Sequence, residues 1–368
     1  MKIFPYRPVR PNLNYIKSAD TFFATVREEY PSYRKTGLFE RGAQEAVIIY
    51  RIEMPNRTHT GLLTCVDLNE YRENNIKKHE HTLASKEQNQ IHLLLLREAQ
   101  VKPILLAVRP NGELEQFVTE NLDKRKADYE LHFDADDSHH RFWEVTDWQQ
   151  IQRLQDIFAR TVDTAYIADG HHRTAAQSTM DIRETAKEGQ NLGKILAAFF
   201  PADELEIWEF NRVIDALEDL SPMRFMANLS KVFDVEILEK IRRPERKHEI
   251  IMVTKTDVYS LKWRPAIIEK YYNDRVLLDV KMLNEEVLRN ILGIEDVRTD
   301  NRVRYVEGIA GPEKVREKVI KTENRIGFIL YPVQMADFME ISDAEMVLPP
   351  KSTWFEPRMK NGLAVREF

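Results

Sequence analysis

The hydrophobic pattern of the N-terminal part of the chain predicts strands that alternate with helices. The runs "EAVIIYRIEM" and "GLLTCVDL" flank the proline-containing loop "PNRTHT", so they predict a β-hairpin. "KPILLAVRP" predicts a short buried strand, and residues 148–160 predict a helix that begins after the N-cap candidate Asp147. Ile91, Leu94 and Leu95 recur at helical spacing and predict one stripe of another helix.

The pattern changes at about residue 220, where we place a domain boundary. Beyond it "MRFMANLSKVF" predicts a helix, "DVEIL" a strand and "KHEIIMVTKTDVYSLKWR" a hairpin. The C-terminal "LPPKSTWFEPRMKNGL" combines prolines with aromatic residues, which is typical of a tail that docks. We therefore predict an α+β (mixed α/β) protein. Its parts are an N-terminal α+β region at residues 1–220, a C-terminal α+β subdomain at residues 221–345 and a tail at residues 346–368 that docks back on the body.

Composition and charge exclude several classes of protein. The chain has 368 residues and a formal net charge of −6, so it lacks the basic footprint that non-specific nucleic-acid binding requires. Its one cysteine, Cys65, permits no intrachain disulfide and suits a reducing compartment. The start "MKIFPYRPVR" lacks the apolar stretch of a signal peptide, and the longest apolar runs are too short to span a bilayer. We therefore expect a cytoplasmic protein with no membrane partner and no nucleic-acid partner.

The stretch "TAYIADGHHRTAAQ" contains the strongest candidate chemistry. "AYIA" predicts a strand, Asp169 and Gly170 predict a turn because glycine adopts backbone angles that other residues resist, and "RTAAQSTMDIRETA" predicts a helix. His171, His172 and Arg173 therefore lie at a helix N-terminus, where free N–H groups and the helix dipole favour an anion. Arginine can make paired hydrogen bonds to phosphate. The turn is predicted to cradle a phosphate.

Other interpretations of this turn stay open. The Asp-Gly pair could only shape the chain while the histidines cap or pack. Zinc is disfavoured because adjacent histidines point in different directions from a turn and no partner follows at helical spacing. The chain contains no P-loop and no GxGxxG sequence, so it does not predict the usual nucleotide folds. Asp169 suits a site that also holds a magnesium ion or a substrate hydroxyl proton.

A second constellation, "NNIKKHEHT", is predicted to lie at the start of a helix after an Asn-Asn turn. Glu80 is a candidate general base, since its flanking imidazoles and lysines would keep it ionised. The alternative is a solvated helix terminus. Arg212, at the end of a predicted strand, could contact ligand or form a structural salt bridge. The tail could bring Lys351 or Arg358 to the phosphates, or it could simply pack.

Resemblance to known families adds to this interpretation. "IADGHHRTAA" resembles the phosphate-binding turn of the ParB/sulfiredoxin superfamily, and "DGHHR" looks most like the free serine kinases of that superfamily. Nearly the whole chain resembles the bacterial domain-of-unknown-function family 1015, through "IKKHEHT", "HRFWEVTD", "YIADGHHRTAA", "ADELEIWEFNRVI" and "LPPKSTWFEPRMKNGL". The resemblance implies a ParB/sulfiredoxin-like core. The chain departs from the family pattern at "TFFATVREEYPSY" and "KEQNQ".

Together these observations predict a nucleotide-dependent phosphotransferase, similar to a free serine kinase, with ATP or ADP and magnesium as cofactors. The acceptor would be a small hydroxyl-bearing metabolite such as serine, or phosphoserine in the reverse direction. The alternatives are a nucleotide-binding regulatory protein without catalysis and a metal-dependent phosphatase or hydrolase. The sequence leaves the oligomeric state open. The residues assigned to catalysis are Glu80, Asp169 and His172, with Asp169 also a candidate magnesium ligand; those assigned to phosphate or nucleotide binding are His79, Gly170, His171, Arg173, Thr174, Arg212 and Lys351.

Overall fold

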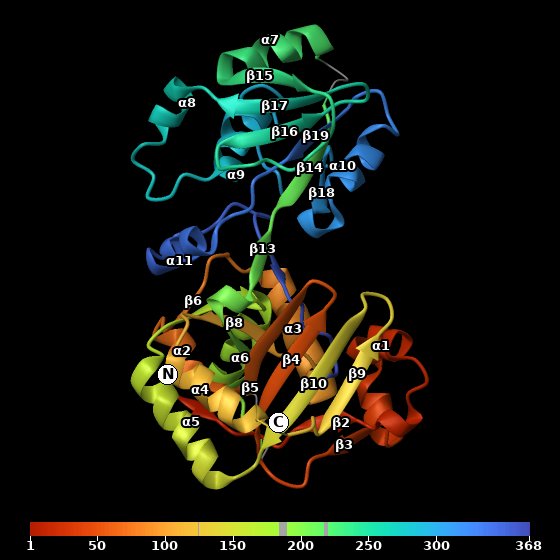
Figure 1. Cartoon of the computed structure of the whole chain (residues 1–368), viewed down its shortest axis with the longest axis vertical. Coiled ribbons are helices and arrows are strands. Elements are labelled where there is room, and N and C mark those ends of the chain that lie inside the picture. The colour runs from red at the N-terminus through yellow and green to blue at the C-terminus, as the bar shows by residue number, and fades with distance from the viewer. Residues whose placement is uncertain (124, 184–189, 217–219) are drawn as a thin grey trace. The chain divides into compact units, whose positions relative to one another are not determined.

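The computed structural model describes residues 1–123, 125–183, 190–216 and 220–368. They form two compact units, which Figure 1 shows as ribbons. The first unit consists of Met1–Glu206 and Pro357–Phe368, and the second of Ile207–Glu356. The sequence placed a boundary near residue 220; the second unit instead begins before β14 (Phe210–Asp215), because that strand pairs with later strands of the same unit.

The first unit contains a mixed sheet with nine strands among the described residues. Their order is β6-β11-β8-β12-β5-β4-β10-β9, and β1 pairs with β5. The strands of this unit are β1 (Ile3–Phe4), β2 (Val9–Pro11), β3 (Phe39–Arg41), β4 (Val47–Met54), β5 (Arg57–Asp67), β6 (Ile76–Lys77), β7 (Ala99–Gln100), β8 (Ile104–Val108), β9 (Tyr129–Phe133), β10 (Ser138–Val145), β11 (Ala165–Asp169), β12 (Lys194–Pro201) and β21 (Arg366–Glu367).

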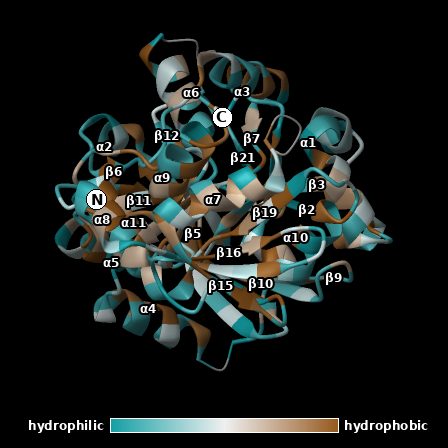
Figure 2. Ribbon diagram, turned by 90° about the horizontal axis from the view of Figure 1, so that it is seen from above, coloured by the Kyte–Doolittle hydropathy of each residue, from teal (hydrophilic) through white to brown (hydrophobic). Residues whose placement is uncertain are grey.

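Helices cover this sheet. They are η1 (Leu13–Tyr15), α1 (Ala19–Lys35), α2 (Leu68–Arg72), α3 (Ala84–Arg97), α4 (Gly112–Leu122), α5 (Trp148–Thr161), α6 (His171–Ile182) and η2 (Ala202–Glu204). Helices α4 and α5 join the strands in one hydrophobic cluster, through side chains such as Phe117, Leu154 and Phe158. Figure 2 shows hydrophobic residues concentrated on strands such as β5, with hydrophilic residues on the surrounding helices.

Several predictions from the sequence pattern are confirmed. β4 and β5 form the antiparallel hairpin, β8 is buried along its whole length, and Asp147 caps α5 by accepting a hydrogen bond from the Gln150 N–H at 2.9 Å. The helix expected from Ile91, Leu94 and Leu95 is α3; Leu94 is buried against α6, whereas Leu95 is 48% exposed. The end of the helix expected from "RTAAQSTMDIRETA" falls on residues 184–189, which lie outside the described residues.

The second unit is built on an antiparallel sheet of order β15-β17-β16-β19-β14-β18. The predicted hairpin is confirmed as β16 and β17, and Val315 and Val319 of α10 pack on the sheet. The elements are β13 (Glu206–Trp208, which begins at the border), β14, α7 (Pro222–Val232), β15 (Phe233–Leu238), β16 (Glu249–Val253), β17 (Val258–Trp263), α8 (Pro265–Lys270), α9 (Asp279–Met282), the π-helical η3 (Leu283–Arg289), β18 (Val303–Glu307), η4 (Gly308–Ala310), α10 (Pro312–Val319), β19 (Arg325–Ile329), α11 (Met335–Asp343) and β20 (Trp354–Glu356).

The architecture is therefore α+β, as predicted, with a mixed sheet in one unit and an antiparallel sheet in the other. Within the described ranges, no helix combines the length and the apolarity that crossing a bilayer requires. The C-terminal segment re-enters the first unit, where β21 pairs antiparallel with β7.

Candidate anion-binding site

The turn between β11 and α6 has the conformation that the sequence predicts. Gly170 adopts φ +114° and forms the N-cap of α6, a helix of 12 residues that begins at His171. A Cβ atom at this glycine would lie 2.8 Å from Ile104 Cγ2, so no other residue fits here without movement of its surroundings. No side chain caps the helix, and its first turn contains no acidic residue. The first N–H groups of α6 thus lack a carboxylate partner of their own.

Three cationic side chains converge on the carboxylate of Asp169. Arg173 Nη2 lies 2.9 Å and Lys102 Nζ 3.1 Å from Asp169 Oδ2, while Arg358 Nη2 lies 3.9 Å from Oδ1. Burial works against the charged carboxylate, but Arg173, Lys102 and Arg358 outweigh it and hold the pKa of Asp169 far below its ordinary value. One carboxylate faces three cations, so this cluster carries an excess of positive charge at the helix N-terminus.

Burial also shifts the titration of the cationic and imidazole groups. It lowers the pKa of Lys102 to about 8, although Asp169 opposes the shift. It lowers the pKa of His171 to about 4 and that of His79 well below the ordinary value, and these two rings lie 4.4 Å apart in an edge-to-face contact. Both imidazoles are therefore neutral at pH 7. They can accept or donate hydrogen bonds without adding charge.

Several polar atoms of the turn have no hydrogen-bond partner among the described residues. They are His171 Nε2, His172 Nδ1 and Arg173 Nε. A buried polar atom without a partner costs about 1–3 kcal/mol, so a ligand that supplied hydrogen bonds here would recover part of that cost. Thr174 differs, because its hydroxyl donates to Gly170 O at 3.1 Å and its side chain is buried. Thr174 therefore stabilises the turn.

The segment with Glu80 lies beside the turn, although not in the predicted way. The sequence placed it at a helix start, whereas Ile76 and Lys77 form β6 and α3 begins only at Ala84. β6 pairs parallel with β11, with Ile76 opposite Ala165, so the residues after both strands emerge at the same sheet edge. Glu80 is exposed, and its charge acts on His172: burial lowers the pKa of His172, and Glu80 opposes that shift.

Two other predicted binding residues belong to the second unit. Arg212 is fully buried there and donates to the carbonyl oxygens of Phe210 and Pro350, and burial lowers its pKa to about 10. The Lys351 ammonium lies 4.6 Å from the centre of the Phe210 ring. Within their own unit, both side chains thus have structural contacts.

Lys102 is a site residue that the sequence analysis missed. It precedes β8, and β8 pairs antiparallel with β11 so that Leu105 lies opposite Asp169. Only this long-range register brings Lys102 to the turn. Its signal in the sequence was weak: a lone lysine before the buried run "PILLAV".

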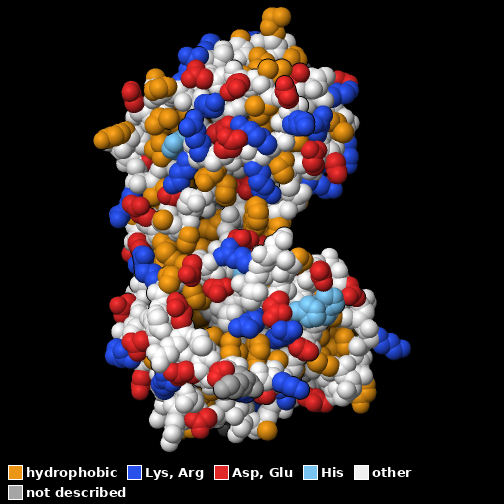
Figure 3. Space-filling model, viewed as in Figure 1, with side chains coloured by type: hydrophobic (Ala, Val, Ile, Leu, Met, Phe, Trp, Pro, Cys, Tyr) orange, Lys and Arg blue, Asp and Glu red, His pale blue; other side chains and the backbone are white. Residues whose placement is uncertain are grey.

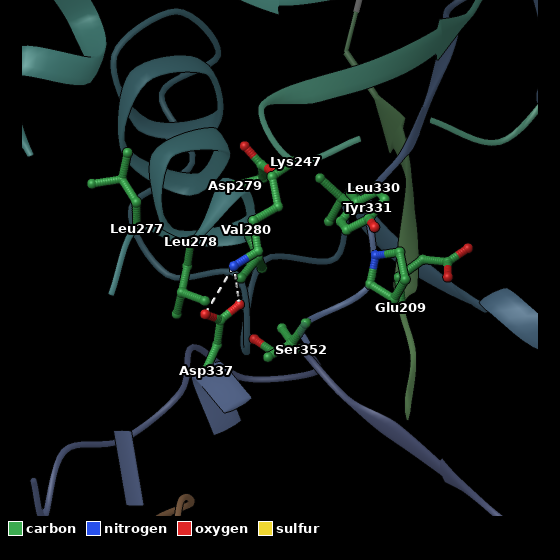
Figure 4. Close-up of a pocket in the computed structure, with 12 residues that line it drawn as sticks. Glu209, Lys247, Leu277, Leu278, Asp279, Val280, Leu330, Tyr331, Asp337 and Ser352 are labelled. Carbon is green, nitrogen blue, oxygen red and sulfur yellow. Dashed lines mark hydrogen bonds and ion pairs between the residues drawn. The ribbon is translucent and has the colours of Figure 1, made fainter. Parts of the chain in front are cut away.

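The second unit contains a small hollow (Figure 4). The ammonium of Lys247 pairs with Asp337 at 2.6 Å, and the carboxylate of Glu209 points away from that pair. Glu209 is buried, pairs with Arg243 at 3.0 Å and packs against Gly308. The free volume is about 20 Å³, enough for one water molecule.

The residues around Asp169 do not fit a resident magnesium ion. Both carboxylate oxygens already face cations, and a divalent ion would add repulsion from Arg173 and Lys102. In the part of the chain that the structure describes, no three His, Cys, Asp or Glu side chains are grouped to hold a metal ion.

Comparison with known proteins identifies a family. The family described as "Protein of unknown function (DUF1015)" matches residues 9–283, about three quarters of the chain. No curated protein matches the sequence.

Solved structures with a related arrangement have low sequence identity. One is a free serine kinase in complex with AMP, with 15% identity, 82% of this chain and 91% of that chain covered, and a TM-score of 0.39. Another is a conserved hypothetical protein from Pyrococcus furiosus, with 14% identity, 83% and 95% coverage, and a TM-score of 0.39. A third is SbnI with C-terminal truncation from Staphylococcus aureus, with 9% identity, 81% and 85% coverage, and a TM-score of 0.43.

Proposed function

The chain belongs to the DUF1015 family, and we propose that it is a nucleotide-dependent phosphotransferase that acts on a small hydroxyl-bearing metabolite, with serine as the first acceptor to test. The phosphates of the nucleotide would bind at the turn between β11 and α6. One observation carries this proposal: three cations surround Asp169 at a helix N-terminus that no side chain caps. This combination attracts an oxyanion with charge and with oriented N–H donors.

The proposed reaction assigns a role to each group of the site. Arg173, Lys102 and Arg358 hold the phosphate oxygens and offset their charge while the phosphoryl group moves. The acceptor hydroxyl oxygen forms a bond to phosphorus, and the bond between phosphorus and the oxygen of the leaving nucleotide breaks. The hydroxyl proton passes to Glu80, which acts as the general base.

Asp169 and the imidazoles have supporting roles in this proposal. Asp169 positions Arg173 and Lys102 through its ion pairs. His172 lies in the turn and feels the charge of Glu80, and its unpaired Nδ1 can bind the acceptor or a phosphate oxygen. His171 is neutral, and its free Nε2 can bind without adding charge.

Ligand-dependent stability tests the binding half of the proposal. Thermal unfolding is measured with ATP, ADP, AMP, serine and phosphoserine, since a ligand of the native state raises the unfolding temperature. We expect a nucleotide to stabilise the wild type and Lys102→Gln to weaken that effect about tenfold in nucleotide concentration. The control is Lys35→Gln, which changes an exposed lysine at the end of α1. Equal effects of both variants would contradict the site.

The catalytic half is tested at Glu80. Glu80→Gln should retain nucleotide binding and lose phosphoryl transfer to serine by at least about 100-fold, because a general base contributes roughly 10²–10⁴-fold. The readout is phosphoserine formed from ATP or from ADP, with binding measured separately. Wild-type turnover in this variant would remove Glu80 from the mechanism.

A nucleotide-binding regulatory protein without catalysis is the second candidate. The exposure of Glu80 favours it, because the cationic cluster could bind a nucleotide without that carboxylate. This role would be favoured if ATP or ADP stabilised the protein but neither transferred a phosphoryl group to any hydroxyl acceptor.

A further inference from the structure

The first unit contains a larger hollow that the proposed phosphotransfer does not use. It has a volume of about 500 Å³ and lies between α4 and strands β8, β12, β5 and β4. Its floor includes Leu62, Val108 and Phe199, and its wall is formed by Leu114, Val118 and Leu122 of α4. This size and this apolar lining are typical of sites for small organic molecules.

The hollow persists because α4 is held beside α5. The guanidinium of Arg160 makes two hydrogen bonds to Glu113 at 2.9 and 2.8 Å, and Arg153 pairs with Glu120. Leu114 is buried against the core, whereas Val118 and Leu122 are only partly buried along the same helix. Apolar surface on α4 therefore remains accessible beside the core, whereas Leu62, Val108 and Phe199 of the sheet are buried beneath it.

The rim of the hollow has a negative charge balance. Among the described residues that line it, the charged ones are Arg51, Glu115, Asp123 and Glu204, which gives three carboxylates for one guanidinium. Arg51 donates to the Thr60 hydroxyl at 3.2 Å and lies over the Trp143 ring, 5.6 Å from its centre. An anion would meet repulsion at this rim, and a cation would meet attraction.

Glu204 is the carboxylate best placed to bind a ligand. It is half-buried in η2 and accepts the Thr60 N–H at 3.3 Å. Burial raises its pKa, and the Thr60 N–H and the guanidinium groups of Arg57 and Arg51 offset that shift only in part. The charged form would therefore still gain from a further cation. Glu115 is exposed on α4, where water screens its charge more.

We propose that this hollow binds a small amphipathic cation, a molecule with an apolar body and a single amine. The apolar body would lie along Val118 and Leu122 of α4, above Phe199, and the ammonium would pair with Glu204 at the rim. The anion-binding turn selects the opposite charge, so the two sites accept different ligands.

Three eight-carbon probes that differ only in their head group test the proposal. Octylamine, octanol and octanoate are titrated into the full chain by calorimetry, below their aggregation concentrations. We expect octylamine to bind about tenfold more tightly than octanol, and octanoate to bind more weakly than octanol. Glu204→Gln should abolish the preference for octylamine over octanol and leave octanol unchanged.

Filling the hollow distinguishes it from the rest of the surface. Val118→Trp should weaken octylamine and octanol binding at least tenfold, because the indole would occupy the hollow. If Val118→Trp lowers the stability of the protein, Thr119→Trp is used instead; it fills the hollow from the exposed rim and should weaken binding to the same extent. The control is Leu96→Ser, which removes an exposed leucine of α3 and should change nothing. The proposal is overturned if octanoate binds most tightly, if no probe binds, or if the filled variants bind octylamine as the wild type does.

Discussion

The tripeptide His-His-Arg occurs twice in this chain, and the two copies differ in what their side chains do. In "SHHR" it lies on β10, and in "GHHR" it opens α6. On the strand, His140 is buried and bonds to the hydroxyls of Tyr50 and Ser138, and Arg141 pairs with Glu53 and Glu130. On the strand, the second histidine and the arginine are thus paired with other side chains, whereas at the helix start both histidines have a ring nitrogen without a hydrogen-bond partner among the described residues.

The difference follows from the backbone that carries them. Successive side chains of a strand point to opposite faces, so His139 and His140 lie on opposite faces of the sheet. His139 contacts its cross-strand neighbour His132. At the helix start, the side chains surround free N–H groups, and Arg173 turns back to Asp169 one helical turn away. Conformation, and not residue type, makes the second copy the candidate site. Figure 3 shows both signs of charge mixed over the viewed face, so overall charge does not reveal it.

Exchanging the residue that precedes each tripeptide should have the largest effect. Gly170→Ser places a side chain at φ +114° and into contact with Ile104, and we expect a loss of roughly 3 kcal/mol in the free energy of unfolding. Ser138→Gly removes hydroxyl contacts to Asp136 and His140 and should cost about 1 kcal/mol. Denaturant unfolding measures both. Equal costs would mean that the turn conformation is not what distinguishes the copies.

Removing each arginine should separate binding from packing. Arg173→Gln should weaken ADP binding about tenfold, because a charge-assisted hydrogen bond to phosphate is lost. Arg141→Gln removes two surface ion pairs and should leave ADP affinity within about twofold. Calorimetric titration with ADP gives both values. A matching loss in Arg141→Gln would contradict the assignment of the site to the turn.

Acidification should act on both copies alike. Burial lowers the pKa of His140 to about 3 and that of His171 to about 4, so both are neutral in the folded chain and protonate near pH 6.5 in the unfolded chain. The unfolded state therefore binds more protons below pH 6.5, and stability falls as the pH decreases toward 4. Each histidine should contribute about 1 kcal/mol of this loss between pH 7 and 5.5. His171→Gln and His140→Gln should each reduce the slope of the free energy of unfolding with pH. An unchanged slope would indicate that the replaced ring is already protonated in the folded chain.

Alkaline conditions should produce the smallest effect, and only at the turn. Burial lowers the pKa of Lys102 to about 8, so its positive charge is lost as the pH rises through that value. Phosphate affinity should fall about threefold between pH 7 and 8.5. Lys102→Arg keeps the charge and should remove the decline. A decline that persists in this variant would place its cause elsewhere.

The sequence predicted the local features and missed the long-range ones. Gly170 and the start of α6 follow from short-range signals, as does the Asp147 cap. Lys102 reaches Asp169 only through strand pairing, which no local pattern encodes. Arg358 is a candidate because the tail is expected to dock, and the return of the C-terminal segment brings it to Asp169. The helix start expected at "NNIKKHEHT" is wrong because Ile76 and Lys77 pair with β11, and two residues are too few to show a strand pattern.

The division of the first unit into two stretches of chain sets an order of assembly. A ribosome makes Met1–Glu206 first, then the whole contiguous second unit, and only afterwards Pro357–Phe368. Until that last stretch emerges, β7 has no β21 beside it and Asp169 lacks Arg358. The cationic cluster around Asp169 is therefore complete only after the second unit has been synthesised.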